Sequence, residues 1–156
     1  MKQSVLCYPE RDGRYLMLYR NRKKNDENAG KWIGVGGQLE EGESPDDCLL
    51  REVREETGLT LTAYRFRGIV TFVSDRYGTE QMYLFTADGL IGTEIACNEG
   101  ELAWIEKDKV LSLPLWEGDR LFLNLLAEEA SVFLLKLVYE GDTLVRAVLD
   151  GRPLSL

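Results

Sequence analysis

Histidine is absent from this chain of 156 residues. Its absence excludes a Ser-His-Asp triad, a Cys-His pair, histidine-bound zinc and a histidine general base. Any acid–base chemistry must therefore use glutamate, aspartate, lysine, tyrosine or cysteine. The three cysteines, Cys7, Cys48 and Cys97, are far apart and form no CxxC pair. Such a scattered, odd-numbered set indicates reduced thiols instead of a disulfide framework. Reduced thiols in turn predict a cytoplasmic protein.

Long apolar runs are lacking as well. No stretch approaches the roughly 18 uncharged apolar residues that a membrane span needs, and the start, MKQSVLCYPERDG, has no signal-peptide pattern. Positive charge is in the minority, with 19 Lys and Arg against 27 Asp and Glu and a net charge of −8. We therefore expect neither a membrane nor a nucleic acid as partner. A small polyphosphate remains compatible if a divalent cation lies between carboxylate and phosphate.

The composition that is present, with 44% hydrophobic residues, suits one folded domain over residues 1–156. A polar loop is expected at 21–31 and Gly-rich short strands at 32–44. Helices are expected at 45–57 and 117–130, and strands at 3–8, 14–20, 61–73, 81–87, 101–106, 131–140 and 143–151. This mixture predicts an α/β fold with a mixed sheet. The oligomeric state is not indicated by the sequence.

The helix at 45–57 has the clearest boundaries. Ser44 is a suitable N-cap, Pro45 occupies the first helical position, and Gly58 is the expected stop. On a helical wheel, one arc is expected to face the core and consists of Leu49, Leu50, Val53 and Thr57.

A neighbouring arc of the same helix carries Glu52, Glu55 and Glu56. Glu56 lies at the border of the two arcs and should point into a cleft. Three close carboxylates repel one another, and the C-terminal end of a helix disfavours anions. A cation with oxygen ligands, such as Mg²⁺, would remove this repulsion. The alternative is a solvated acidic face, with Arg51 and Arg54 as ion-pair partners.

The flanking residues decide between these interpretations. Nine positions of residues 37–59 have the spacing of the Nudix box: Gly37, Glu43, Arg51, Glu52, Val53, Glu55, Glu56, Gly58 and Leu59. The chain therefore resembles the Nudix hydrolase family. The resemblance implies an α/β/α sandwich with a mixed sheet, dependence on Mg²⁺ with Mn²⁺ as a possible substitute, and hydrolysis of a nucleoside diphosphate linked to another moiety.

The resemblance also implies roles for individual residues. Glu52, Glu55 and Glu56 match metal-binding glutamates, and the carbonyl of Gly36 matches a frequent backbone ligand. Glu99 is the candidate for a further acidic ligand, with Glu101 in reserve; the alternative for Glu99 is an exposed loop residue. Glu43 and Arg51 match positions that orient the catalytic helix by a salt bridge, and Gly37 is a candidate substrate contact. Water is expected to attack phosphorus, with a glutamate or a metal-held hydroxide accepting its proton.

Most of the chain resembles the family branch that destroys oxidised purine nucleoside triphosphates. In that branch a tryptophan followed by acidic residues holds the base; here the segment is Leu115-Trp116-Glu117-Gly118-Asp119. Trp116 is expected to stack on a purine, unless it is a core aromatic, and Asp119 to hydrogen-bond a base edge. The chain departs from the branch at two positions, where Gly118 replaces an aspartate and Ile33 replaces a base-reading asparagine. Lys23 and Lys24 are either phosphate contacts or simply solvated.

We therefore predict hydrolysis of oxidised or otherwise modified nucleoside triphosphates, such as 8-oxo-dGTP, to the monophosphate and pyrophosphate, a nucleotide-sanitation activity. One alternative is a Nudix enzyme for a pterin triphosphate, a pyrimidine triphosphate or a nucleoside diphosphate sugar. Another is a non-catalytic Nudix module that binds a nucleotide.

Overall fold

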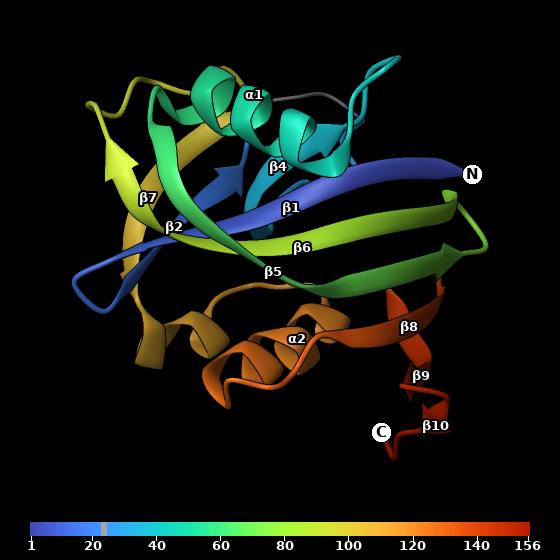
Figure 1. Ribbon diagram of the computed structural model, residues 1–156. Helices are drawn as coiled ribbons and strands as arrows, with labels where there is room; N and C mark the ends of the chain where they lie inside the picture. Colours follow the sequence, from blue (N-terminus) through green and yellow to red (C-terminus); the bar gives the residue numbers. More distant parts are fainter. Residues whose placement is uncertain (23–24) are drawn as a thin grey trace.

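The protein forms three layers, with one helix on each side of a twisted sheet (Figure 1). The computed structural model describes residues 1–22 and 25–156, so Lys23 and Lys24 lie outside the described residues. The helices are α1 (Pro45–Thr57) and α2 (Glu117–Ala127), with a short 3-10 helix, η1 (Lys107–Ser112). The strands are β1 (Lys2–Arg11), β2 (Arg14–Arg20), β3 (Trp32–Ile33), β4 (Val35–Gln38), β5 (Thr60–Ser74), β6 (Gly78–Ile91), β7 (Gly100–Glu106), β8 (Phe133–Glu140), β9 (Thr143–Leu149) and β10 (Arg152–Pro153).

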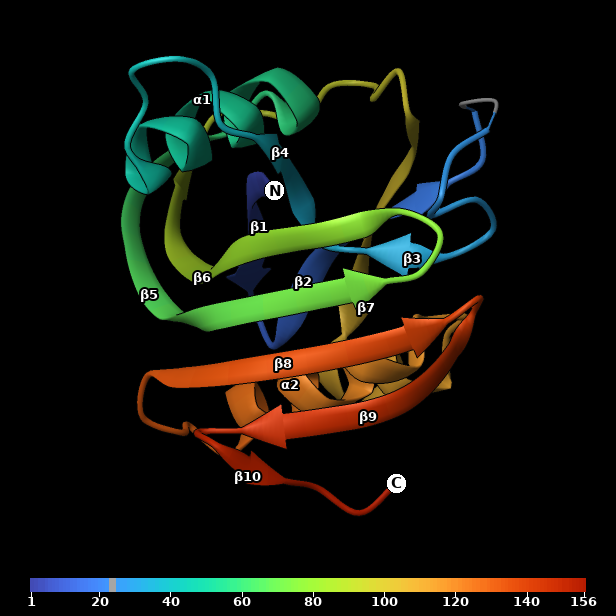
Figure 2. The ribbon, with the colours of Figure 1, turned by 90° about the vertical axis from the view of Figure 1, so that its right-hand side faces the viewer.

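The sheet is mixed, as the sequence predicted. Its main path runs β10-β9-β8-β5-β6-β1-β2-β3, while β4 pairs with β1 and β7 with β2. β1 and β6 are parallel, as are β5 and β8; the other pairs are antiparallel. Figure 2 shows β6, β5, β8 and β9 following one another down the molecule. The expected α/β/α sandwich is confirmed.

Helix α1 begins and ends where its sequence predicted. The Ser44 side chain accepts a hydrogen bond from the Asp47 backbone, the Asp47 side chain accepts one from the Ser44 backbone, and Gly58 is the C-cap with φ of 80°. These reciprocal bonds satisfy amide groups that a helix start leaves unpaired. The buried face contains Leu49, Val53 and Thr57, but Leu50 is 38% exposed, so its expected place in the core is wrong.

Two hydrophobic clusters fill the space on either side of the sheet. One lies beneath α1 and includes Cys7, Leu49, Val53 and Leu59. The other includes residues of α2 and of the C-terminal hairpin. Each helix therefore packs on its own cluster, and the sheet between the two helices contributes side chains to both clusters.

Several elements differ in length from the sequence predictions. Helix α2 ends at Ala127, not at residue 130, because Glu129 has a positive φ of 55°. The strand expected at 81–87 extends over Gly78–Ile91, because almost its whole length pairs with β5. The 3-10 helix η1 had no counterpart in the prediction.

Candidate active site

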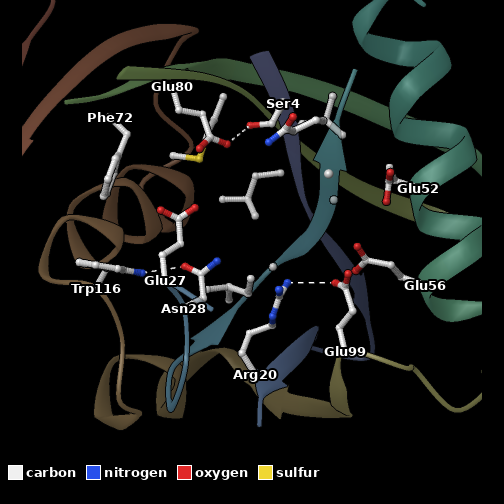
Figure 3. Close-up of a pocket in the computed structure, with 18 of the residues that line it drawn as sticks. Ser4, Arg20, Glu27, Asn28, Glu52, Glu56, Phe72, Glu80, Glu99 and Trp116 are labelled. Carbon is white, nitrogen blue, oxygen red and sulfur yellow. Dashed lines mark hydrogen bonds and ion pairs between the residues drawn. The ribbon is translucent and has the colours of Figure 1, made fainter. Parts of the chain in front are cut away.

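One pocket of about 380 Å³ brings together residues that are far apart in the sequence. At one end are Glu52 and Glu56 of α1 and Glu99 of the loop before β7; at the other is Trp116, which directly precedes α2 (Figure 3). Asp119 of α2 also lines the pocket. Residues of β1 and β4 form the floor between the two ends. The pocket therefore joins a carboxylate cluster to an aromatic, buried recess.

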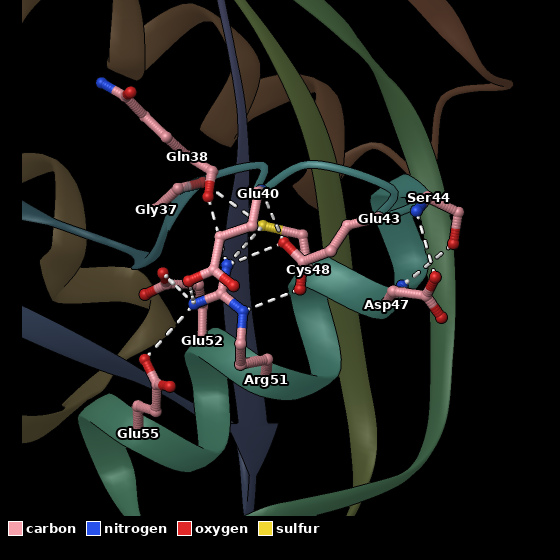
Figure 4. A network of polar contacts seen from close by, with 10 residues as sticks. All are labelled: Gly37, Gln38, Glu40, Glu43, Ser44, Asp47, Cys48, Arg51, Glu52 and Glu55. Carbon is pink, nitrogen blue, oxygen red and sulfur yellow. Dashed lines mark hydrogen bonds and ion pairs between the residues drawn. The ribbon is translucent and has the colours of Figure 1, made fainter.

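Arg51 organises the carboxylate end from the surface of α1 (Figure 4). Its Nε and Nη2 donate to the two oxygens of Glu43 at 2.7 and 2.8 Å, and its Nη1 donates to Glu52 at 2.7 Å and to Glu55 at 3.3 Å. Nη2 also donates to the carbonyl of Gln38 at 3.2 Å. Two parallel charge-assisted bonds fix orientation as well as distance. The guanidinium therefore connects the loop before α1, the end of β4 and two of the predicted metal ligands.

Glu52 fits against β4 because residue 37 has no side chain. A Cβ added at Gly37 would lie 2.5 Å from the Glu52 carboxyl carbon, inside van der Waals contact. Burial raises the pKa of Glu52, while the hydrogen bond from Arg51 opposes that shift. Gly36, whose carbonyl is a predicted ligand, borders the same pocket.

Glu56 is the most enclosed of the three helix glutamates, with 9% of its surface exposed. Its Oε2 atom is buried and has no hydrogen-bond partner among the described residues. Burial, followed by the charges of Glu99 and Glu52, raises the pKa of Glu56 to about 9. The prediction that Glu56 points into a cleft is confirmed. Glu55 differs, because its side chain is 61% exposed and contacts Arg51 on the outside of α1.

Glu99 lies in the pocket wall and pairs with a buried arginine. Arg20, at the end of β2, donates from Nη1 to Glu99 at 3.0 Å and from Nε to Asp26 at 2.7 Å. Arg20 thereby fixes Glu99 in place across from Glu56 (Figure 3). Glu101, the reserve candidate, lies on β7 and borders a separate hollow beside Cys97.

The carboxylate end has the donors that a hard divalent cation requires. In the part of the chain that the structure describes, no three acidic or cysteine side chains lie close enough together to hold a metal as they stand. Two of the carboxylates are instead paired, Glu52 with Arg51 and Glu99 with Arg20. The unpaired, buried Oε2 of Glu56 nevertheless faces these carboxylates with a free acceptor. Oxygen donors of this kind suit Mg²⁺ or Mn²⁺, so the residues fit the implied metal.

At the other end of the pocket, Trp116 is 4% exposed and packs edge to face with Phe72 and Tyr139. The Lys31 ammonium lies 4.3 Å from the centre of its ring. Trp116 thus belongs to the core below the sheet and also forms part of the pocket wall. A base that stacks on the ring face covered by Lys31 would have to displace the ammonium.

Asp119 is buried in the same recess. Burial raises the pKa of its carboxyl from 3.8 to about 7, against the opposing effect of Arg120 and Lys31. A carboxyl that is neutral near pH 7 can donate a hydrogen bond as well as accept one.

The two departures from the family branch have structural explanations. A Cβ at Gly118 would lie 2.5 Å from Leu137 and 2.8 Å from the Tyr139 hydroxyl, so an aspartate there requires these two side chains to shift. The Gly118 backbone N–H instead donates to that hydroxyl at 2.7 Å. Ile33 lines the pocket where the branch has an amide, which leaves an apolar wall.

Several residues of this pocket have no recognisable signal in the sequence. Arg20, Asp26, Asn28, Phe72 and Met82 all line the pocket. The polar composition of 21–31 predicted only a loop, and nothing in its pattern identified Asp26 or Asn28 as inward-facing. Phe72 and Met82 lie on predicted strands, but the pairing of these strands around the pocket is not a local property.

Comparison with known proteins agrees with this architecture. The family model described as NUDIX domain matches residues 2–126. An oxidized purine nucleoside triphosphate hydrolase of Danio rerio is 32% identical over 142 residues, covering 88% of this chain and 87% of the relative. An uncharacterized Nudix hydrolase of Bacillus subtilis is 33% identical over 118 residues, covering 72% of this chain and 71% of the relative.

The crystal structure of a mutator MutT protein from Bacillus halodurans superposes with a TM-score of 0.87 at 28% identity, covering 98% of this chain and all of the other. That structural match includes the C-terminal hairpin, which lies beyond the part matched by the family model. The sequence match, the intact box and the fold lead to the same assignment: the chain belongs to the Nudix family and is a Nudix hydrolase.

Proposed function

We propose that this Nudix hydrolase cleaves oxidised or otherwise modified purine nucleoside triphosphates, such as 8-oxo-dGTP, to the monophosphate and pyrophosphate. The observation that carries the proposal is the single pocket that joins the carboxylate cluster of Glu52, Glu56 and Glu99 to the recess of Trp116 and Asp119. The carboxylate cluster, with a bound cation, would accept the triphosphate, and the recess of Trp116 and Asp119 would accept the purine. The relative from Danio rerio, named an oxidized purine nucleoside triphosphate hydrolase, supports the same substrate class.

We assign the binding of Mg²⁺, or of Mn²⁺ in its place, to Glu52, Glu56, Glu99 and the carbonyl of Gly36. The ion, when bound, neutralises phosphate charge and makes water more acidic. Glu55 is proposed as an outer member of this set, since it is exposed and its described contact is with Arg51. Arg51 and Glu43 act as positioning residues, because their ion pair fixes the helix that carries the glutamates.

The attacking water must lose a proton as its oxygen bonds to phosphorus. The chain has no histidine, so we assign this proton to a carboxylate of the cluster. Gly37 lets the cluster lie directly beside β4, where the phosphates would pass. Asp119, when neutral, donates to an acceptor on the base, while Trp116 and Phe72 enclose the base with apolar surface.

A panel of nucleotides with Mg²⁺ and a pyrophosphate readout tests the proposal. We expect pyrophosphate from purine nucleoside triphosphates, with kcat/KM highest for an oxidised purine. Preferential turnover of a nucleotide sugar, a pterin triphosphate or a pyrimidine triphosphate would assign the chain to another Nudix activity. Tight nucleotide binding without turnover would make it a binding module and overturn the proposal.

The proposal includes one domain over residues 1–156 and a cytoplasmic site of action, where nucleotide pools are found. No helix within residues 1–22 and 25–156 is long and apolar enough to cross a membrane.

A further inference from the structure

We propose that Asn28 reads the base, and that it selects bases with a carbonyl oxygen at carbon six over bases with an amino group there. This inference rests on the proposed function and adds a specificity to it. The residue lies in the loop between β2 and β3, in the wall of the pocket beside Trp116 (Figure 3).

The orientation of the Asn28 amide follows from its contact with Trp116. The indole Nε1–H donates to Asn28 Oδ1 at 2.8 Å. An indole N–H is a donor only, so the amide must present its oxygen to it. The NH₂ group therefore faces the other way, and Figure 3 shows the amide nitrogen on the side away from Trp116.

The NH₂ group is free to contact a ligand. No described residue accepts a hydrogen bond from it, and Ile33 lines the same pocket with an apolar side chain. Two donors on the pocket wall without a protein acceptor require an acceptor from water or from a ligand. The Asn28 amide thus offers donors beside Trp116, in a pocket where Ile33 replaces the asparagine of the family branch.

The backbone holds Asn28 in place. Its N–H donates to Asp26 Oδ1 at 3.1 Å, and its carbonyl accepts from the Lys31 N–H at 3.0 Å. Asp26 is in turn fixed by buried Arg20. These two backbone contacts fix the position of residue 28, and the indole bond fixes its side chain before any base arrives, as a specificity contact requires.

A fixed donor discriminates between base edges. Guanine, 8-oxoguanine and hypoxanthine carry an acceptor oxygen at carbon six, whereas adenine carries an amino donor. If the amino group of adenine faced the Asn28 NH₂ group in an enclosed site, both donors would be unpaired. Sites with such a mismatch reject the wrong substrate strongly. The oxygen of Asn28 is turned toward the Trp116 indole, so the opposite side of the amide presents only donors to a base.

Replacing Asn28 by Asp is the sharpest test. An aspartate keeps an acceptor for the indole N–H but removes both donors. Inosine and adenosine triphosphates differ only at carbon six and in the proton on the neighbouring N1, so the ratio of their kcat/KM values reports on this edge of the base. We expect Asn28→Asp to lower the inosine-to-adenosine ratio by on the order of tenfold or more. The added charge affects both triphosphates equally and cancels in the ratio.

Asn21→Asp is the matched control, because Asn21 is exposed and lies in the same loop. This substitution adds the same charge and should leave the inosine-to-adenosine ratio unchanged. An unchanged ratio in Asn28→Asp, or an equal loss for both substrates, would show that Asn28 only anchors Trp116 and would overturn the inference.

A measurement on the unmodified protein requires no variant to fold. Inosine monophosphate should bind more tightly than adenosine monophosphate in calorimetry, and equal affinities would also overturn the inference. Failure of the unmodified protein to cleave any nucleoside triphosphate is a different result, which would overturn the proposed function and this inference with it.

Discussion

Arg51 and Glu43 form a two-point ion pair, with Nε to Oε2 at 2.7 Å and Nη2 to Oε1 at 2.8 Å. The pair lowers the pKa of Glu43 to about 2, so its carboxylate stays charged at all ordinary pH values. Since the same guanidinium also donates to Glu52, the orientation of a predicted metal ligand depends on a bond made outside the pocket.

Replacing Arg51 by Ala should therefore lower both stability and activity. The loop before α1 loses its link to the helix, and Glu52 loses the donor that orients it. We expect a fall of several degrees in Tm and of about 10–100-fold in kcat, since small displacements of reacting groups are costly. Arg54→Ala is the control, because Arg54 is exposed on the same helix and makes no ion pair within residues 1–22 and 25–156. Equal melting temperatures for Arg51→Ala and the unmodified protein would contradict the positioning role.

Replacing Glu56 by Gln should separate chemistry from folding. The amide keeps the shape of the side chain but cannot be charged, so kcat should fall by on the order of 10²-fold or more. Tm should stay the same or rise, because a buried carboxyl with a raised pKa is costly to ionise. Steady-state rates and melting curves measure the two effects. Loss of the folded state in Glu56→Gln would show that this carboxyl is structural.

Asp119 should make stability depend on pH. Its pKa in the folded protein, about 7, lies above the ordinary value of 3.8, so the fold favours the protonated carboxyl. The resulting contribution is complete below about pH 4 and is lost as the pH rises through 7.

Asp119→Asn is the matching variant, since its amide does not titrate in this range. We expect the unmodified protein to lose stability relative to this variant between pH 4 and 7, by about 1 kcal/mol per pH unit. Denaturant unfolding at several pH values measures the difference. The variant should also change the ratio of rates for oxidised and normal guanine nucleotides. A difference in stability that is independent of pH would contradict the raised pKa.

Replacing Trp116 by Ala should raise KM more than it lowers kcat. Loss of a base-contacting aromatic surface costs on the order of 1–3 kcal/mol. Tm should fall as well, because Trp116 packs against Phe72 and Tyr139 in the core. KM is therefore the deciding measurement: an unchanged KM in the folded fraction would make Trp116 a core residue only and favour a different Nudix substrate.

The parts of the structure that local sequence determines were predictable. Ser44, Asp47 and Gly58 set both ends of α1, because caps act through neighbouring backbone groups. The glutamates of the box had a fixed spacing on that helix, so the position of Glu56 in a cleft followed from the wheel. The exposure of Leu50 did not follow from the wheel, since it depends on which neighbouring elements cover the helix.

The contacts that complete the pocket depend on long-range packing. Arg20 and Glu99 are 79 residues apart, and Trp116 and Asn28 are 88 apart. These pairs meet because β2, the loop after it and α2 converge on one edge of the sheet. A local pattern in the sequence carries no information about that convergence, so Asn28 and Arg20 were not predicted.

Analysis of the products formed from 8-oxo-dGTP, with and without Mg²⁺, decides whether the protein is a metal-dependent pyrophosphohydrolase. We expect the monophosphate and pyrophosphate in equal amounts with Mg²⁺ present, and no turnover after exhaustive treatment with EDTA until Mg²⁺ is restored. Release of inorganic phosphate and the diphosphate, or turnover that survives the removal of metal, would contradict this expectation.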